Sequence, residues 1–205
     1  SNNIATIHAL CYRMWGRPPI AEKGALAKEW NSHAYAEWRV GDGQVDLEEG
    51  VEPSKEHGKE MALYNLARAR LEDDTPYWQE NPMVQEWQRF KVEHQAMDFA
   101  DMINLSLDVF PELVSHPRVL AVDETQDLTP AQMRLVRRWA ADSAVEQFIM
   151  AGDADQTIYS FVGARPDEFM DGMPALLAAG KARILSQSQR LPRTVHAAAQ
   201  RWIDQ

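Results

Sequence analysis

The apolar residues in the middle of the chain recur at helical spacing. Between about residues 24 and 38 they fall four apart, which places them along one face of a helix. These residues are Leu26, Trp30, Ala34 and Trp38. Two further helices are predicted over 59–72 and 83–96, and glycine and proline stand at the joints and in an acidic loop over 41–58. Residues 17–96 are therefore predicted to be all-helical.

The flanking segments alternate short apolar runs with helical ones. Ile4–Ile7 predicts the end of a strand, and a helix follows it over His8–Trp15. Buried strands are predicted over Val119–Val122 and Phe148–Ala151, and a third strand over Arg183–Leu185. This alternation predicts an α/β fold with a parallel sheet and crossover helices.

Polar residues mark the beginnings of further helices in the α/β part. Asp98 is a suitable N-cap, and the run Thr129–Gln132 has the form of a capping box with proline at the first helical position. A closing helix is predicted over about 192–204. We therefore expect an α/β part over 1–16 and 97–205, interrupted by the helical segment as an insertion.

Composition indicates an ordinary globular protein. The 205 residues are 45% hydrophobic and 25% charged, which argues against disorder. No stretch approaches the roughly 18 consecutive apolar residues of a membrane span. Cys11 is the only cysteine, which excludes an intramolecular disulfide. These features predict a cytoplasmic protein with no membrane partner.

The formal net charge of −10 argues against nucleic-acid binding, because phosphate contacts usually need a basic surface. Motor proteins often confine their basic groups to one channel. The charge therefore does not exclude DNA.

Acidic residues follow two of the predicted strands. In doubly wound sheets, ligands bind beyond the carboxyl ends of parallel strands. Asp123 and Glu124 follow the first strand. Phosphoryl transfer to water needs one carboxylate for Mg²⁺ and another to orient or deprotonate the water, and this pair suits both tasks. An acidic pair also occurs where a strand simply leaves a core.

The second strand is followed by a glycine turn and an amide. Gly152 lets the chain turn tightly, and Gln156 can hydrogen-bond a phosphate or an attacking water without adding negative charge. Tyr159 and Phe161 offer two aromatic faces within three residues, as a platform for stacked bases would. Aromatic residues in such a segment are also common in a core.

The order of these segments resembles the superfamily 1 DNA helicases of the UvrD/Rep/PcrA family. Asp123–Asp127, Gly152–Tyr159 and Leu185–Arg190 are similar to its motifs II, III and IV. Upstream, Thr6–Arg13 is similar to motif Ib, and Asp98–Met102 to the segment that returns from the family's helical insertion. The resemblance covers nearly the whole chain and implies a P-loop NTPase (RecA-like) sheet with an inserted all-helical subdomain.

The resemblance also implies a function and a role for each matching residue. It implies part of a helicase or translocase that couples hydrolysis of Mg²⁺-ATP to movement on single-stranded DNA. The ATPase site would use Asp123 for Mg²⁺, Glu124 as the base, Gln126 and Gln156 to link the γ-phosphate to DNA contacts, Asp153 for nucleotide binding and Arg190 for the γ-phosphate. The DNA contacts would be Thr6, His8, Tyr159 and Phe161.

The sequence departs from the family pattern at three places. Gln189 stands where the family usually has a tyrosine that stacks on adenine, and Phe161-Val162 stands where it has tryptophan-arginine. The two Gly-Lys pairs, Gly58-Lys59 and Gly180-Lys181, both lie outside any phosphate-binding loop pattern, the Walker A motif. We therefore expect the chain to start downstream of that loop and to act with a Walker A segment and a C-terminal motor domain.

Two alternatives come from other functional classes. A degenerate helicase-like module could bind DNA or a protein without hydrolysing ATP. A metal-dependent nuclease could use the acidic residues Asp123, Glu124, Asp127, Asp153 and Asp155. The nuclease hypothesis leaves Gln156, the aromatic pair Tyr159 and Phe161, and Arg190 unexplained.

Overall fold

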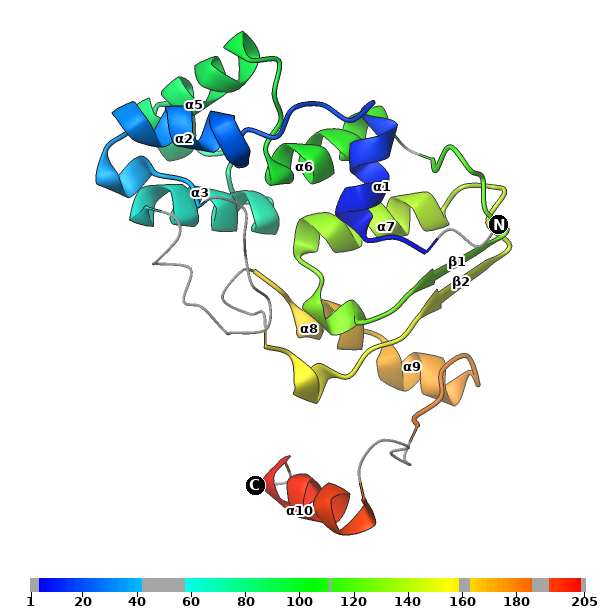
Figure 1. The fold of residues 1–205 in the computed structure, drawn as a ribbon. Coiled ribbons are helices and arrows are strands. Elements are labelled where there is room, and N and C mark those ends of the chain that lie inside the picture. The colour runs from blue at the N-terminus through cyan, green and yellow to red at the C-terminus, as the bar shows by residue number, and fades with distance from the viewer. Residues whose placement is uncertain (1–3, 42–57, 111, 159–162, 186–191, 204–205) are drawn as a thin grey trace.

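The computed structural model describes residues 4–41, 58–110, 112–158, 163–185 and 192–203 (Figure 1). The α-helices are α1 (Ile7–Met14), α2 (Gly24–His33), α3 (Lys59–Arg70), α4 (Pro76–Gln79), α5 (Pro82–Glu93), α6 (Phe99–Val109), α7 (Pro130–Ala140), α8 (Pro166–Met170), α9 (Met173–Ala178) and α10 (Arg193–Ile203). The strands are β1 (Val119–Val122) and β2 (Gln147–Met150), and the short 3₁₀ helices are η1 (Ala36–Trp38), η3 (Thr125–Asp127) and η4 (Ala154–Gln156). Among the described residues, no helix has the length and apolar character that a membrane crossing requires.

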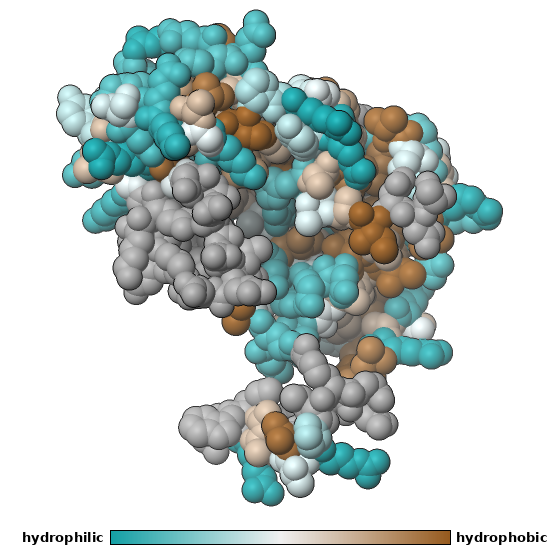
Figure 2. Space-filling model, in the orientation of Figure 1, coloured by the Kyte–Doolittle hydropathy of each residue, from teal (hydrophilic) through white to brown (hydrophobic). Residues whose placement is uncertain are grey.

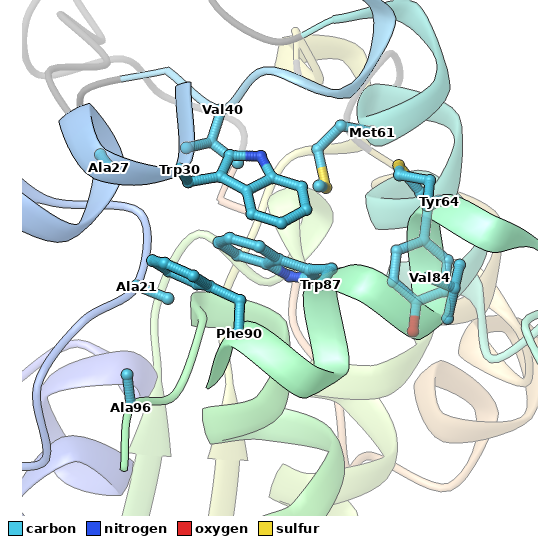
Figure 3. Close-up of a cluster of buried hydrophobic side chains, with 11 residues drawn as sticks. Ala21, Ala27, Trp30, Val40, Met61, Tyr64, Val84, Trp87, Phe90 and Ala96 are labelled. Atoms are coloured by element: carbon cyan, nitrogen blue, oxygen red, sulfur yellow. The ribbon is translucent and has the colours of Figure 1, made fainter. Parts of the chain in front are cut away.

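Helices α2, α3 and α5 enclose an aromatic core. Trp30 and Trp87 meet edge-on with ring centroids 4.8 Å apart, and Phe90 stacks on Trp87 at 5.7 Å (Figure 3). Both tryptophans are buried, and the Nε1 of Trp30 donates to the carbonyl of Trp38 at 2.8 Å. Met61 and Tyr64 close this core from α3. Such aromatic packing stabilises the helical part through both burial and ring geometry.

A second core lies between α1, α6 and α7. Its buried residues include Cys11, Met102, Leu135 and Trp139. The Nε1 of Trp139 donates to the carbonyl of Phe110 at 3.1 Å, which ties α7 to the end of α6. Ile20 and Leu71, from the stretch 17–96, also pack against this second core, so the two parts of the chain are in contact there.

A buried ion cluster joins the helical part to α6. Asp98 lies 2.7 Å from both Arg68 of α3 and Lys91 of α5, and Asp101 pairs with the same two cations. Burial alone would raise the pKa of Asp98, but the two cations outweigh it and lower that pKa. Glu22 lies beside the cluster and accepts from the backbone N–H of Phe99 at 2.8 Å. Burial, and then the charge of Asp98, raise the pKa of Glu22 to about 7.

The strands form a parallel pair in which Val122 lies opposite Met150, and α7 forms the crossover between them. The predicted capping boxes at Asp98 and Thr129 are confirmed at the starts of α6 and α7. β1 is confirmed over Val119–Val122, and β2 begins one residue earlier than predicted.

The predicted burial of both strands is wrong. Residues along each strand alternate between exposed and half-buried, and Val119 and Ile149 are 53% and 42% exposed. Figure 2 shows hydrophobic side chains gathering on the side of the molecule where the strands lie. The reason is that few described elements pack over the faces of this two-stranded pair. An apolar run in the sequence indicates that a strand can be buried, not that other elements cover it.

Other boundaries also differ from the predictions. Residues 4–6 are not a strand, because Thr6 instead caps α1, which begins at Ile7. The predicted helix over 24–38 ends at His33, since Ala34 is extended and η1 then brings Trp38 back to the same core. The joint at Pro76 itself forms α4.

The C-terminal part has one wrong prediction and one that is confirmed. Arg183–Leu185 forms no strand, because no described segment lies beside it as a ladder partner. The closing helix is confirmed as α10, which Figure 1 shows apart from the other helices.

Within 17–96, the described residues 17–41 and 58–96 form helices, turns and one isolated bridge between Ile20 and Met97. Most of the predicted acidic loop lies outside the described residues. No described residue of this stretch pairs with β1 or β2, as the predicted helical insertion requires.

Candidate functional site

The carboxyl ends of β1 and β2 lie side by side, and each continues into a 3₁₀ helix, η3 or η4 (Figure 1). The backbone N–H of Ala151 donates to the carbonyl of Val122 at 2.9 Å, which extends the pairing one residue beyond β2. This edge brings together the predicted site residues Asp123, Glu124, Gln126, Asp153 and Gln156. The sequence-based placement of these five at one sheet edge is therefore correct.

The turn after β1 holds two exposed carboxylates. Glu124 has a left-handed backbone, with φ 52° and ψ 41°, which is unfavourable for a residue with a side chain. Its N–H donates to the Oδ1 of Asp123 at 3.0 Å. The hydrogen bond holds the turn, and both carboxylates remain at the surface, where a ligand can reach them.

Thr125 anchors this turn to the other strand. It is fully buried, and its backbone N–H and its hydroxyl both donate to the carbonyl of Ala151, at 2.9 and 2.8 Å. No role of its own was predicted for Thr125 from the sequence. Its position between the acidic pair and Gln126 was the only sequence feature that could have indicated an anchoring role. A threonine at such a position is compatible with many structures.

Gln126 connects the two strand-end segments. Its side chain is buried, its Nε2 donates to the Oε2 of Glu124 at 2.8 Å, and its Oε1 accepts from the backbone N–H of Asp153 at 3.0 Å. One amide therefore orients the Glu124 carboxylate and fixes the start of the turn after β2. A carboxylate at this position could not donate to Glu124 in the same way.

Gly152 is required by this bridge rather than by an unusual backbone angle. A Cβ at Gly152 would lie 2.5 Å from the Oε1 of Gln126 and 3.1 Å from the backbone nitrogen of Thr125. This glycine was predicted to allow a tight turn. The physical reason is instead the close approach of the two segments.

Asp153 organises the turn after β2. Its Oδ1 accepts from the N–H of Asp155 at 3.1 Å, and its Oδ2 accepts from the Nε2 of Gln156 at 2.6 Å. Gln156 is exposed, whereas Gln126 is buried. The two amides therefore occupy different environments at one site.

Asp127 contributes a carboxyl group with one oxygen that accepts no hydrogen bond from the described residues. Its Oδ1 is buried without a hydrogen-bond partner. Burial, and then the nearby charge of Glu124, raise the pKa of the Asp127 carboxyl. It lies on η3 with Gln126, so its environment is part of the same site.

The five acidic residues of the nuclease hypothesis do not assemble into a metal site. Within the part of the chain that the structure describes, no three of them are grouped closely enough to share an ion. The oxygens of Asp153 are instead hydrogen-bonded to Asp155 and Gln156. The nuclease hypothesis is therefore not supported.

The predicted DNA contacts at the start of the chain lie on α1. Thr6 is exposed, and its hydroxyl oxygen accepts from the N–H of Ala9 at 3.2 Å. His8 is half-buried and edge-on to Phe99, with ring centroids 5.8 Å apart. Burial lowers the pKa of His8, against a hydrogen bond with the Phe99 backbone that raises it. Tyr159, Phe161 and Arg190 lie outside the described residues.

Comparison with known proteins gives a consistent family match. The model of the UvrD/REP helicase N-terminal domain matches residues 1–173. The chain is 30% identical over 189 residues to the ATP-dependent DNA helicase UvrD2 of Mycobacterium tuberculosis, covering 81% of this chain and 27% of UvrD2. It is 27% identical over 188 residues to YjcD of Bacillus subtilis, covering 81% of this chain and 23% of YjcD.

A shorter match supports the same family. The chain is 37% identical over 87 residues to the ATP-dependent DNA helicase PcrA of Leuconostoc citreum, which covers 38% of this chain and 11% of PcrA. The chain thus spans about a quarter of the length of UvrD2 and YjcD.

Proposed function

Because this chain belongs to the UvrD/REP helicase N-terminal domain family, we propose that it carries part of the ATPase site of an ATP-dependent DNA helicase or translocase. The observation that carries the proposal is the Gln126 bridge between Glu124 and Asp153. It unites two segments that would contact the phosphates and the attacking water.

Asp123 and Glu124 would divide the chemistry between them. Asp123 offers an exposed carboxylate, the kind of oxygen donor that Mg²⁺ prefers, and a bound Mg²⁺ would neutralise charge on the phosphate oxygens. Glu124 would accept a proton from the water that attacks the γ-phosphorus, and ADP would leave. The hydrogen bond from Gln126 keeps the Glu124 carboxylate oriented for this task.

The remaining site residues would bind the nucleotide and report its state. Gln126 and Gln156 would link the γ-phosphate to the DNA contacts, and Asp153 would support nucleotide binding by holding Gln156. Arg190 would contact the γ-phosphate, because its fixed charge suits the oxygens of a phosphoryl transition state.

Single-stranded DNA would contact α1 and the segment after η4. The hydroxyl of Thr6 accepts at the helix cap and keeps its own proton for a phosphate oxygen. The lowered pKa of His8 favours a neutral ring, which would contribute a hydrogen bond rather than charge. Tyr159 and Phe161 would stack on bases.

We assign the α/β part, 1–16 and 97–205, to a RecA-like P-loop NTPase fold and 17–96 to an inserted helical subdomain. The exposed apolar residues on one face of β1 and β2 are consistent with further elements of such a fold packing over that face. The partners would be a Walker A segment, which supplies the amide cradle and lysine for the phosphates, and a C-terminal motor domain. The 205-residue chain alone should therefore not hydrolyse ATP, and robust turnover by it would contradict this assignment.

The test is Glu124→Gln in a protein that contains this chain together with a phosphate-binding loop. Nucleotide binding should persist, and DNA-stimulated hydrolysis should fall by at least about 100-fold, because a general base contributes about that much. The matched control is Glu146→Gln, which changes an exposed carboxylate paired with Arg118 before β2. Near-normal turnover of the Glu124 variant would show that Glu124 is not the base.

A further inference from the structure

A histidine and two carboxylates meet near the amino ends of the strands, away from the site just described. Glu112 and His116 lie in the segment between α6 and β1, and Asp142 lies in the segment between α7 and β2. One potential ligand atom from each residue lies within 4.8 Å of the other two. No proposed step of ATP hydrolysis uses these residues.

The spacing of the three atoms suits one small cation. The Nδ1 of His116 is 3.1 Å from the Oδ2 of Asp142 and 3.8 Å from the Oε2 of Glu112. A tetrahedral zinc ion with bonds of about 2.0–2.1 Å separates neighbouring ligand atoms by about 3.3 Å. These two distances lie on either side of that value, and the ligand atoms of Glu112 and Asp142 lie within 4.8 Å of each other, so side-chain adjustment on ion binding would complete the geometry.

Asp142 is held in place before any ion binds. Its side chain is only 3% exposed, and its Oδ1 accepts from the N–H of Ala144 at 2.9 Å, while its Oδ2 is the oxygen near His116. A fixed, charged ligand reduces the ordering that metal binding requires.

The other two ligands provide access from solvent. His116 and Glu112 have side chains 56% and 54% exposed. The backbone at His116 is left-handed, with φ 39°, and its N–H donates to the carbonyl of Leu113 at 2.9 Å. This turn directs the imidazole back toward Asp142 rather than along the chain.

We propose that Glu112, His116 and Asp142 form a binding site for a divalent transition-metal ion of the zinc type. An imidazole nitrogen with two carboxylate oxygens favours Zn²⁺ over Mg²⁺, which prefers oxygen ligands and octahedral geometry. A water molecule would take the fourth position on the exposed side. The ion would tie the segment that enters β1 to the segment that enters β2, a structural role independent of ATP hydrolysis.

The test is titration of the metal-free 205-residue chain with Zn²⁺ by calorimetry at pH 7.5. One Zn²⁺ should bind at this site, and His116→Ala should weaken that binding by at least about 10-fold, since changes around metal ligands commonly cost 10- to 100-fold. The matched control is His94→Ala. His94 lies 3.1 Å from one carboxylate, that of Glu29, so its removal should leave Zn²⁺ binding by the chain nearly unchanged.

A second variant keeps the test decisive if His116→Ala folds poorly. Asp142→Asn retains the size of the side chain and an oxygen that can accept from Ala144, but it removes the charge. It should weaken Zn²⁺ binding similarly. Absence of Zn²⁺ binding to the parent, or equal binding by the parent and both variants, would overturn the proposal and leave the cluster as an ion pair only.

Discussion

Replacing Glu22 with glutamine should change how the stability of the chain depends on pH. Glu22 is 4% exposed, and its carboxyl faces Asp98, Arg68 and Lys91 in the cluster that joins the helical part to α6. Arg68 and Lys91 are already matched by Asp98 and Asp101. A third carboxylate would therefore be in excess, which is consistent with a pKa raised from 4.5 to about 7.

The sign and size of the effect follow from proton linkage. The folded chain keeps a proton on Glu22 that the unfolded chain loses, so the free energy of unfolding falls as the pH rises from about 4.5 to about 7. At about 1.4 kcal/mol per pH unit, the whole loss is about 3 kcal/mol, of which about 2 kcal/mol falls between pH 5.5 and 8.5. Glu22→Gln removes this loss, and its amide oxygen can still accept from Phe99.

The assay is urea unfolding of the parent and Glu22→Gln at pH 5.5 and 8.5. The free energy of unfolding of the variant, minus that of the parent, should be about 2 kcal/mol larger at pH 8.5 than at pH 5.5. The control is Glu60→Gln, since Glu60 accepts hydrogen bonds from Trp38 and Asn81 outside the ion cluster. A difference between variant and parent that stays constant across this pH range would refute the argument from burial and Asp98.

Two further changes test the packing that positions the site. Asp98→Asn removes a negative charge that pairs with two buried cations, Arg68 and Lys91, and should lower the free energy of unfolding by about 3–5 kcal/mol. The control Arg89→Gln, at an exposed ion pair, should change it by less than about 1 kcal/mol. Equal losses for the two variants in urea unfolding would argue against a buried cluster. Gly152→Ala places a Cβ 2.5 Å from the Oε1 of Gln126 and should cost about 1–3 kcal/mol in the same assay, and an unchanged stability would mean that Gln126 does not approach Gly152 so closely.

Local signals in the sequence predicted local features well. The caps at Asp98 and Thr129 were recognisable because their hydrogen bonds link residues three positions apart. The recurrence of apolar residues at every fourth position, which includes Leu26, Trp30 and Trp38, identified the correct core residues but predicted the wrong helix length. The helix ends at His33, and a separate 3₁₀ turn returns Trp38 to the same core, an arrangement that periodicity alone does not distinguish from a continuous helix.

Features that depend on distant partners could not be predicted in this way. Arg183–Leu185 is apolar enough for a strand, but a strand also needs a neighbouring ladder, and none of the described segments provides one. The ion cluster was also missed, because Arg68, Lys91 and Asp98 come from three separate elements. Each residue read alone is an ordinary charged position on a helix or at its cap.

The candidate site depends most on a contact between residues 27 positions apart, from the side chain of Gln126 to the backbone of Asp153. The sequence suggested equivalent roles for Gln126 and Gln156, but their environments differ. Buried Gln126 is bonded on both sides, whereas exposed Gln156 is held only through Asp153 among its described contacts. A displacement of Glu124 is therefore expected to reach Asp153 through Gln126, because the buried amide has no solvent to replace a lost partner. The side chain of Gln156 is exposed, so it can exchange its hydrogen bond with Asp153 for one with a ligand or water at lower cost. Gln126 is therefore better suited to transmit a change between the two segments, and Gln156 to sense a bound ligand.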